Sequence, residues 1–501
     1  MNSMPVNPHP INLYSGEATR KLDSIAINEF KIPGYELMKR AGKAVFNHLQ
    51  NTYPLAKQIL VCCGAGNNAG DGYVIARLAK QAGLNVKVIS LVDTAKLEGD
   101  AKTAWQDWNS LGYQLSKYSA GLLQQTDIVI DALLGTGLQR QVEGEWADLI
   151  DAINNSGKTV IAVDIPSGLC ADTGSIAGHA ISATATMTFI GLKKGLFTHL
   201  GVDHCGDIIF DNLSLPSGVY SRQAEQAQLL DWEYLKKQLK PRKASVHKHQ
   251  LGHVIILGGD KGMPGAIRMA AEAALRSGAG LVTVVSHSEH APVLLAGRAE
   301  LMIFASNDGQ VPTDLLNKAS AIVVGPGLTN SLWSQNIMAS ALQCSALKVI
   351  DAGALRLLGE NAAHRDDWVL TPHAGEAAAL LGESSIAIQE SRFSSVEMLQ
   401  YKFGGHIILK GAGSLLQSPE ELIQLCPYGN PGMASAGMGD VLSGIIASLL
   451  AQGYNMTLAC RLGLCIHSLA GDLAAADGQT GLLASDLYGH IRQLMNSHEK
   501  S

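Results

Sequence analysis

The sequence has few aromatic residues and no excess of positive charge. Phe, Trp and Tyr make up 5% of its 501 residues, and the formal net charge is −6. Such a chain is not expected to bind nucleic acid or a membrane surface by general electrostatic attraction. Any anionic ligand would have to be held locally, by backbone N–H groups and a few lysines.

The sequence also lacks cysteine pairs with metal-binding spacing. Its eight cysteines include no C-x-x-C, which argues against a zinc site or a redox pair of the thioredoxin type. Cys62 and Cys63 lie in an apolar run, and we expect buried free thiols in a reducing cytoplasm. The first ten residues do not resemble a signal peptide, and we find no apolar run long enough to span a bilayer.

Glycine and aliphatic residues, in contrast, are abundant. The chain contains 53 glycines and is 47% hydrophobic, a composition that suits an α/β protein with many tight turns between strands and helices. Its length predicts about two to four domains.

The first half begins with a predicted helical region, residues 13–50, divided by Pro33 and Gly34. An apolar run at 58–63 precedes the glycine-rich stretch G-A-G-N-N-A-G-D-G (64–72) and an amphipathic segment at 73–82. This pattern predicts a strand, a glycine turn and a helix, as in mononucleotide-binding units. Because the spacing is not G-x-G-x-x-G, it is not the usual dinucleotide motif.

Further strands are predicted at 86–92, 127–134 and 159–165, and strands that alternate with helices imply a parallel sheet. Asp131 and Asp164 would then lie near the carboxyl ends of strands, where α/β proteins bind ligands. Together with Asn68 and Ser167 they would form an oxygen-rich cluster suited to a hard cation. Alternatively, each aspartate caps the helix that follows, which is the more usual role for either residue alone.

Four motifs carry a resemblance to a known family: N-N-A-G-D-G (67–72), D-A-L-L-G-T-G-L (131–138), V-D-I-P-S-G-L (163–169) and T-F-I-G-L-K-K-G (188–195). From about Tyr14 to Asp211 the chain resembles the epimerase domain of bifunctional NAD(P)H-hydrate repair enzymes. The resemblance implies a Rossmann-like three-layer sandwich over residues 1–225. It implies that the hydrated nucleotide is bound by Asn67, Asn68, Ala69, Gly70, Asp71, Gly135, Thr136, Gly137, Leu138, Gln139, Arg140, Gln141 and Asp164.

The same resemblance implies a potassium ion held by Asn68, Asp131 and Ser167. Epimerisation inverts the hydrated C6 of the nicotinamide ring, so a group must move a proton or labilise the substituent. Asp164 is the predicted acid–base catalyst. Lys194 is a second candidate, although a lysine after a strand is usually a solvated surface residue.

In the second half, N-P-G-M-A-S-A-G-M-G-D-V-L-S-G (430–444) places glycines directly before a helix-like apolar run. Free N–H groups at a helix N-terminus bind anions such as phosphate. A carboxylate there would repel phosphate, so Asp440 fits a base that deprotonates a hydroxyl attacking phosphorus. It could equally be an ordinary N-cap, and the stretch alone does not distinguish the two.

Strands are predicted at 253–257, 281–285, 321–324, 348–351 and 406–409, with a helix at 266–277. From about Ser245 to Met495 this order is similar to a ribokinase-like fold, and within it to nucleotide-dependent NAD(P)H-hydrate dehydratases. The motifs are G-G (258–259), A-L-R-S-G-A-G-L (274–281), G-P-G-L (325–328), L-T-P-H-A-G-E (370–376), K-G-A-G-S (410–414) and G-M-G-D-V-L-S-G (437–444).

The resemblance implies that residues 226–501 form a dehydratase domain in which Asp440 is catalytic. Implied substrate contacts are Ala266, Gly327, His373 and Asp440, and implied nucleotide contacts are Lys410, Gly411, Ala412, Gly413, Ser414 and Gly439. By analogy, Glu376 would help to order Mg²⁺. His373 alone would be more typical of a structural histidine, and Asp351 is left unassigned as a possible cap. Met438 departs from the small or hydroxyl residue common in kinases of this fold.

These implications describe one repair pathway. The dehydratase would phosphorylate the C6 hydroxyl of the S hydrate with ADP, giving AMP, phosphate and NAD(P)H, while the epimerase converts the R form. The residues themselves do not decide between ADP and ATP. We expect a cytoplasmic homo-oligomer with small-molecule substrates and no nucleic-acid or membrane partner. Two alternatives are a small-molecule kinase whose first half only binds ligand, and a non-enzymatic RNA-processing scaffold.

Overall fold

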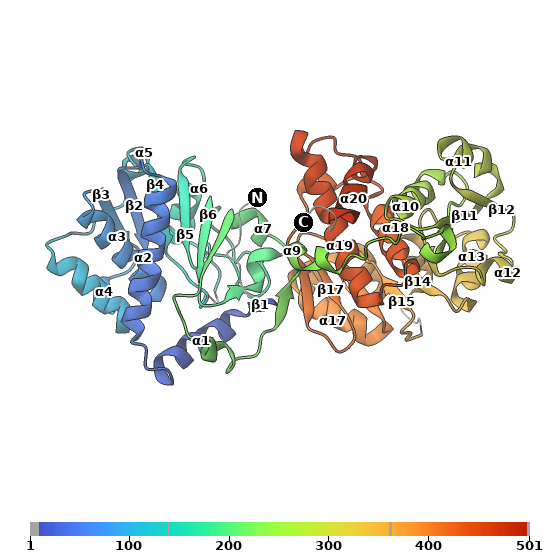
Figure 1. Ribbon diagram of the computed structural model, residues 1–501. Helices are drawn as coiled ribbons and strands as arrows, with labels where there is room; N and C mark the ends of the chain where they lie inside the picture. The colour runs from blue at the N-terminus through green and yellow to red at the C-terminus, as the bar shows by residue number, and fades with distance from the viewer. Residues whose placement is uncertain (1–9, 139, 360–362, 498–501) are drawn as a thin grey trace. The chain divides into compact units, whose positions relative to one another are not determined.

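The structure is a computed structural model that describes residues 10–138, 140–359 and 363–497 (Figure 1). The chain divides into two compact units, Met1–Gln228 and Leu229–Ser501. Both units are α/β, which confirms the predicted fold class.

The first unit is built around a six-stranded parallel sheet in the order β3-β2-β4-β5-β6-β8. Its strands are β2 (Gln58–Cys63), β3 (Asn85–Ser90), β4 (Ile128–Ala132), β5 (Thr159–Val163), β6 (Ala185–Phe189) and β8 (Asp207–Asp211). Outside this six-stranded sheet, β1 (Ile11–Tyr14) pairs in parallel with β7 (Leu192–Lys193), so residues 13 and 14, predicted to be helical, are in fact in a strand.

Helices cover both faces of this sheet, which makes the three-layer sandwich. Ile59, Val61 and Cys63 of β2 pack with one set of helices, whereas Leu60 and Cys62 pack with the other. The first set is α1 (Gly16–Asn28), α2 (Gly34–Thr52), α3 (Asn67–Gln81) and α4 (Gly99–Ser110). The second set is α5 (Ala120–Gln124) and α6 (Glu145–Asn154). Short helices α7 (Gly201–His204) and α8 (Ser217–Tyr220) complete the unit.

Helix α3 begins six residues earlier than predicted. Asn67 to Gly72 form its first turns, and Gly66 is the N-cap, so the stretch predicted to be a glycine turn is mostly helical. Glycine is needed there for close packing rather than for a turn, because a Cβ atom on Gly70 would lie 2.5 Å from the Cε of Met38. The polar side chains of this stretch are therefore held on a rigid helix.

The second unit contains nine strands in the order β12-β11-β10-β13-β14-β15-β16-β17-β18. The sheet is parallel from β12 to β16 and ends in the antiparallel strands β17 and β18. Its strands are β10 (His253–Leu257), β11 (Leu281–His287), β12 (Met302–Ser306), β13 (Ala321–Val324), β14 (Leu347–Ile350), β15 (Trp368–Leu370), β16 (His406–Leu409), β17 (Ser414–Gln417) and β18 (Ile423–Cys426). Strand β9 (Ala227–Leu229) lies at the division between the units.

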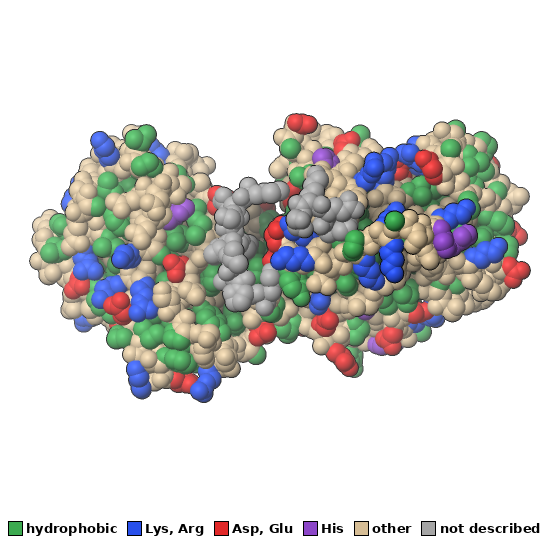
Figure 2. Space-filling model, viewed as in Figure 1, with side chains coloured by type: hydrophobic (Ala, Val, Ile, Leu, Met, Phe, Trp, Pro, Cys, Tyr) green, Lys and Arg blue, Asp and Glu red, His purple; other side chains and the backbone are tan. Residues whose placement is uncertain are grey.

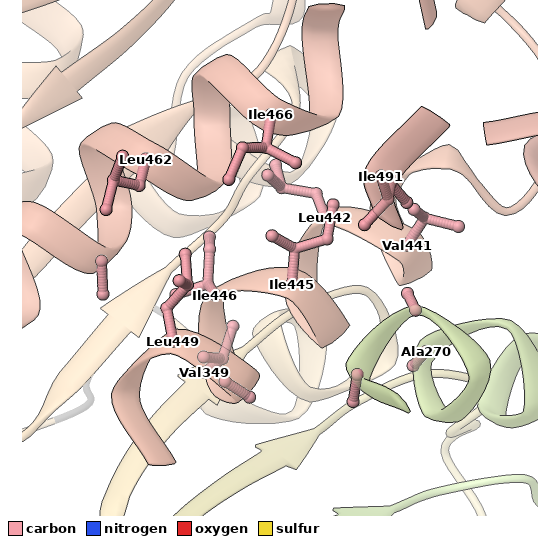
Figure 3. Close-up of a cluster of buried hydrophobic side chains, with 14 of the residues drawn as sticks. Ala270, Val349, Val441, Leu442, Ile445, Ile446, Leu449, Leu462, Ile466 and Ile491 are labelled. Atoms are coloured by element: carbon pink, nitrogen blue, oxygen red, sulfur yellow. The ribbon is translucent and has the colours of Figure 1, made fainter. Parts of the chain in front are cut away.

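The main core of this unit lies between the sheet and the helices α10 (Pro264–Arg276), α18 (Met438–Ala451), α19 (Met456–Ala474) and α20 (Leu487–Met495). Figure 3 shows Val441, Leu442, Ile445 and Ile446 of α18 directed into it. The remaining helices are α9 (Trp232–Leu235), α11 (Ala291–Gly297), α12 (Thr313–Leu316), α13 (Leu332–Gln343), α14 (Gly353–Leu358), α15 (Ala374–Leu381), α16 (Ser385–Glu390) and α17 (Arg392–Phe403). Because α18 is buried almost throughout, its N-terminus is held rigidly.

One helix corrects the expectation that no segment is long and apolar enough to cross a membrane. Residues Met456–Asp477 meet that criterion by length and composition, and most of the stretch is buried inside the second unit. Its apolar residues, such as Leu462 and Ile466, belong to the core of the fold. A search for an uninterrupted apolar run does not find this helix, because polar residues interrupt its apolar sequence.

All eight cysteines are free, and seven of them are buried, as expected. Figure 2 shows acidic and basic side chains interspersed on the visible face of each unit.

Two candidate active sites

The first candidate site is a cavity of about 740 Å³ at the carboxyl ends of β2, β4, β5 and β6. Predicted binding residues that line it are Asn67, Asn68, Asp71, Gly135, Thr136, Gly137, Leu138, Arg140 and Asp164. Three predicted binding residues do not line the cavity: Ala69, Gly70 and Gln141. Ala69 is fully buried in the core between the sheet and helices α1 to α4. Gln139 lies outside the described residues.

Asp164 directly follows β5 and has a left-handed backbone, with φ of +66°. Such a conformation is uncommon in a residue other than glycine and is often found at functional sites. Its Oδ1 accepts hydrogen bonds from the Nζ of Lys193 and, at 3.1 Å, from the N–H of Phe189. Asp164 is therefore not a helix cap.

Lys193 is the lysine that contacts Asp164, and Lys194 is partly exposed in the next turn. The Lys193 side chain is fully buried, and its Nζ also donates to the Oγ1 of Thr188 at 2.8 Å. Burial lowers the pKa of Lys193 below its usual value, and Asp164 offsets only part of this effect. A buried lysine with a lowered pKa is well suited to proton transfer. The sequence shows only two adjacent lysines, and β7 determines which one points inward.

Asp71 adds a second carboxyl group to the cavity. Burial raises the pKa of Asp71 well above its usual value, and the nearby charges of Asp164 and Asp23 raise it further. Burial also raises the pKa of Asp23. The cavity therefore combines Asp164, which is paired with a lysine, with a neighbouring carboxyl group that retains its proton more readily than usual.

The predicted oxygen cluster is assembled beside this cavity. The fully buried Asp131 accepts the Oγ–H of Ser167 at 2.6 Å and the N–H of Ser167 at 2.8 Å. Asn68 donates its Nδ2 to the carbonyl of Leu134 at 3.0 Å, while its buried Oδ1 has no hydrogen-bond partner. Burial raises the pKa of Asp131 to about 6. An unpaired buried oxygen next to a buried carboxyl group fits a hard cation, because the cation would compensate both.

The second candidate site lies at the N-terminus of α18. Gly437, with φ of +89°, is the N-cap, and Asp440 is the third helical residue. The alternative that Asp440 is an ordinary N-cap is therefore wrong. The carboxylate of Asp440 makes no hydrogen bond among the described residues. Burial raises the pKa of Asp440 to about 7, and the charges of Asp351 and Glu376 contribute.

Lys410 and Asp351 form an ion pair beside Asp440. The Nζ of Lys410 donates to the Oδ1 of Asp351 at 2.7 Å and lies 3.8 Å from Glu376. Burial lowers the pKa of Lys410, but Asp351 and Glu376 raise it above its usual value overall. A Cβ atom on Gly439 would lie 3.1 Å from this Nζ. The sequence interpretation left Asp351 unassigned, although it directly follows the central strand β14 just as Asp164 directly follows β5.

His373 and Glu376 have a structural role in addition to any catalytic one. They form a capping box at the start of α15: the Nδ1 of His373 accepts the N–H of Gly375 at 3.0 Å, and Glu376 accepts the N–H of His373 at 2.9 Å. The His373 side chain is 59% exposed, so one edge of the ring remains accessible. Ala266, in the first turn of α10, is partly exposed. Gly327 lies against Met263 and Gly259 in the turn after β13.

The predicted nucleotide-binding residues 410–414 form the turn between β16 and β17 together with the first residue of β17. The N–H of Lys410 donates to the carbonyl of Pro372 at 2.9 Å, which ties the turn to the loop that carries His373. The Oγ of Ser414 closes the turn by donating to the carbonyl of Gly411 at 3.1 Å. Within the described part of the chain, no three His, Cys, Asp or Glu side chains form a ready metal cage. Mg²⁺ often binds through one or two carboxylates and substrate phosphates instead, and Asp440, Asp351 and Glu376 supply such carboxylates.

Comparison with known proteins agrees with this arrangement. The family model described as YjeF-related protein N-terminus matches residues 34–195, and the model described as NAD(P)H-hydrate dehydratase matches residues 254–493. The bifunctional NAD(P)H-hydrate repair enzyme Nnr of Coxiella burnetii is 43% identical over 487 residues, which cover 97% of this chain and 99% of that enzyme. Its counterpart in Escherichia coli is 40% identical over 498 residues, with 99% and 96% covered.

Solved structures resemble the second unit. The ADP/ATP-dependent NAD(P)H-hydrate dehydratase of Bacillus subtilis, co-crystallised with ATP and Mg²⁺, is 25% identical with a TM-score of 0.50, covering 54% of this chain and 98% of that one. A ribokinase-like superfamily protein of Enterococcus faecalis is 27% identical with a TM-score of 0.51, covering 55% and 97%. These matches confirm the ribokinase-like fold. With full-length relatives at this identity, the chain belongs to the family of bifunctional NAD(P)H-hydrate repair enzymes.

Proposed function

We propose that the two sites perform consecutive reactions on hydrated nicotinamide nucleotides. Residues 1–225 interconvert the R and S hydrates, and residues 226–501 convert the S hydrate to NAD(P)H at the expense of a nucleotide phosphate. The observation that carries the proposal is the arrangement at α18, where an unpaired Asp440 with a pKa of about 7 adjoins a lysine and a helix N-terminus.

In the dehydratase site, Asp440 removes the proton of the C6 hydroxyl as that oxygen attacks the terminal phosphorus of the nucleotide. A base with a pKa near 7 is effective at neutral pH. The N–H groups of the first turn of α18, together with Lys410, stabilise the charge on the transferred phosphoryl group. Phosphate is a far better leaving group than hydroxide, so it departs as the ring nitrogen donates electrons, and loss of a proton from the adjacent C5 then restores the dihydropyridine.

In the nucleotide-binding part of this site, residues 410–414 and Gly439 hold the donor, while His373, Gly327 and Ala266 contact the hydrated substrate. Asp440, Asp351 and Glu376 are the carboxylates available to Mg²⁺. A bound Mg²⁺ would neutralise negative charge on the nucleotide phosphates. We propose ADP as the phosphoryl donor, with AMP and phosphate as products. Direct comparison of ADP and ATP as donors tests this choice.

In the epimerase site, Asp164 and Lys193 form the proton-transfer pair that acts at C6. The ion pair keeps Asp164 oriented toward the cavity, and Asp71 lies close enough to influence both charges. Asn68, Asp131 and Ser167 are proposed to hold K⁺, which fits the unpaired Oδ1 of Asn68. When bound, the ion supplies positive charge near the nucleotide phosphates. The loop 135–141 contacts the nucleotide itself.

The free cysteines are consistent with a reducing cytoplasm, where we propose that the enzyme acts, as a homo-oligomer on small-molecule substrates. The proposal is tested by mixing the protein with hydrated NADH, Mg²⁺ and ADP or ATP and following the absorbance of the reduced nicotinamide. Recovery from both epimers supports it. Phosphorylation of an unrelated alcohol without recovery would instead indicate a small-molecule kinase.

A further inference from the structure

Arg392 is a fully buried cation placed where a helix disfavours positive charge. It is the first residue of α17 and is 2% exposed. The N-terminus of a helix carries partial positive charge, so a cation there is destabilised, and burial adds a desolvation cost. Burial lowers the pKa of Arg392 to about 10, which leaves it charged at neutral pH. Because this placement of a charge costs free energy, we infer that Arg392 makes interactions that offset the cost.

The guanidinium group is directed at the turn between β16 and β17. Its Nη2 donates to the carbonyls of Leu409 and Gly413, both at 3.2 Å. Its Nη1 lies 3.4 Å from the carbonyl of Lys410 and donates to the Oε1 of Gln389 at 2.8 Å. Three carbonyls within residues 409–413, which include the end of β16 and the turn after it, thus converge on a single planar cation.

This convergence determines where the N–H groups of the turn point. In a trans peptide the N–H is directed opposite to the carbonyl of the same plane. With the carbonyls of Lys410 and Gly413 turned inward to Arg392, the N–H groups of Gly411 and Ser414 are turned to the other side, where the N–H of Gly411 donates to the Oγ of Ser414 at 3.3 Å. The guanidinium also lies under Gly411, where a Cβ atom would be 2.6 Å from Nη1. Only a glycine at 411 allows this close approach.

We propose that Arg392 is a positioning residue for the phosphoryl donor, one that holds the 410–414 segment in the single conformation that binds the nucleotide. It does not touch the nucleotide. The same contacts hold the main chain of Lys410, whose side chain reaches Asp351 and the site of phosphoryl transfer. This inference rests on the proposed nucleotide-dependent dehydration.

The experiment compares Arg392→Ala and Arg392→Lys with Lys348→Met in the full-length protein. Lys348 is a cation of the same unit and is also fully buried. It lies in β14, at the end of the strand away from Asp351, and bonds to Asp367. For each variant we would measure the melting temperature, the KM for the nucleotide, the kcat of dehydration and the epimerisation rate. Added guanidinium ion, at millimolar concentration, is tested as a rescuing agent for Arg392→Ala.

We expect Arg392→Ala to raise the nucleotide KM about tenfold to a hundredfold, as for the loss of hydrogen bonds from a charged donor. Arg392→Lys should show a smaller rise, because an ammonium ion cannot reach three carbonyls at once. Guanidinium should recover part of the lost affinity. Lys348→Met should lower the melting temperature without changing the KM, and epimerisation should be unchanged in all variants.

An unchanged nucleotide KM in both Arg392→Ala and Arg392→Lys without added guanidinium, with only a lower melting temperature, would overturn the inference. A rise in KM equal to that of Lys348→Met would overturn it as well. If the unmodified protein instead shows no nucleotide-dependent dehydration, the proposed function itself fails, which is a distinct result.

Discussion

Each unit places a carboxylate near a lysine, fully buried in the first unit and partly buried in the second, and the two lysines have different partners. In the first site Lys193 bonds directly to Asp164, the proposed proton-transfer residue. In the second site Lys410 bonds to Asp351, and the proposed base Asp440 is left without a hydrogen bond among the described residues. The partner of the lysine, rather than its presence, determines which carboxylate can accept a proton. Two similar sets of residues can thus support different chemistry.

The largest expected effect comes from removing the base of the second site. Asp440→Asn cannot accept the hydroxyl proton, so we expect dehydration to fall about 100-fold to 10,000-fold. Nucleotide binding should be retained because residues 410–414 and the carboxylates of Asp351 and Glu376 are unchanged, and epimerisation should be retained because it takes place in the other unit. Single-turnover measurements of reduced-nicotinamide absorbance check the loss, and calorimetric titration checks binding. Near-normal turnover would refute the role of Asp440.

The matching change in the first site is Lys193→Met. Loss of the partner of Asp164 should lower epimerisation about 100-fold and leave dehydration of the pure S hydrate unchanged. Lys194→Met is the matched control and should retain activity, since Lys194 is partly exposed. Epimerisation can be followed by chromatographic separation of the two hydrates. Equal losses in both variants would contradict the assignment to Lys193.

A change of pH sharpens the contrast between the sites. The rate of dehydration should rise with pH through about 7 and then level off, because Asp440 acts in its ionised form and its pKa is raised to about 7. Asp351→Asn removes one of the charges that raise this pKa, so the midpoint should move to lower pH. The profile of kcat against pH for both proteins checks this. A midpoint that stays in place would show that Asp351 does not influence Asp440.

The smallest expected effect concerns stability of the first unit. The pKa of Asp131 is raised to about 6 in the folded protein, above its unfolded value of about 3.9. The folded state therefore binds this proton more tightly, and without a cation the free energy of unfolding should fall as pH rises from about 4 to 6. The shift corresponds to about 3 kcal/mol at most.

A bound K⁺ would offset this loss. Thermal unfolding in potassium chloride and in choline chloride should therefore differ above pH 6 and converge below it. Asp131→Asn should abolish both the pH dependence and the difference between the salts. An equal salt effect in that variant would argue against a cation at Asp131.

Much of the fold could be predicted from local sequence patterns. The parallel strands of both units were found because strands covered on both faces read as continuous apolar runs. Asp131, Asp164 and Asp440 were found because they lie at strand ends or a helix start, where ligands bind. The location of these three aspartates can be predicted because it depends only on residues that are close to them in the sequence.

The remaining features depend on packing between distant segments. The start of α3 was missed because Gly70 and Gly72 serve close packing, Gly70 against Met38 and Gly72 against Ala132, whereas a local pattern of glycines predicts a turn. The sequence pattern led us to name Lys194, whereas Lys193 contacts Asp164, because only the orientation of the two-residue strand β7 decides which lysine points inward. Asp351 pairs with Lys410, and Arg392 donates to the carbonyl of Gly413. Both contacts join residues that are distant in the sequence, so no local pattern could predict them.

The most direct test of two separate, consecutive sites uses a mixture of both hydrates with nucleotide and Mg²⁺. Asp164→Asn should restore only the S fraction, Asp440→Asn should restore none, and the two variants together should restore all of the reduced coenzyme, because the epimer released by one protein is used by the other. Failure of the mixed variants to exceed Asp164→Asn alone would contradict the account.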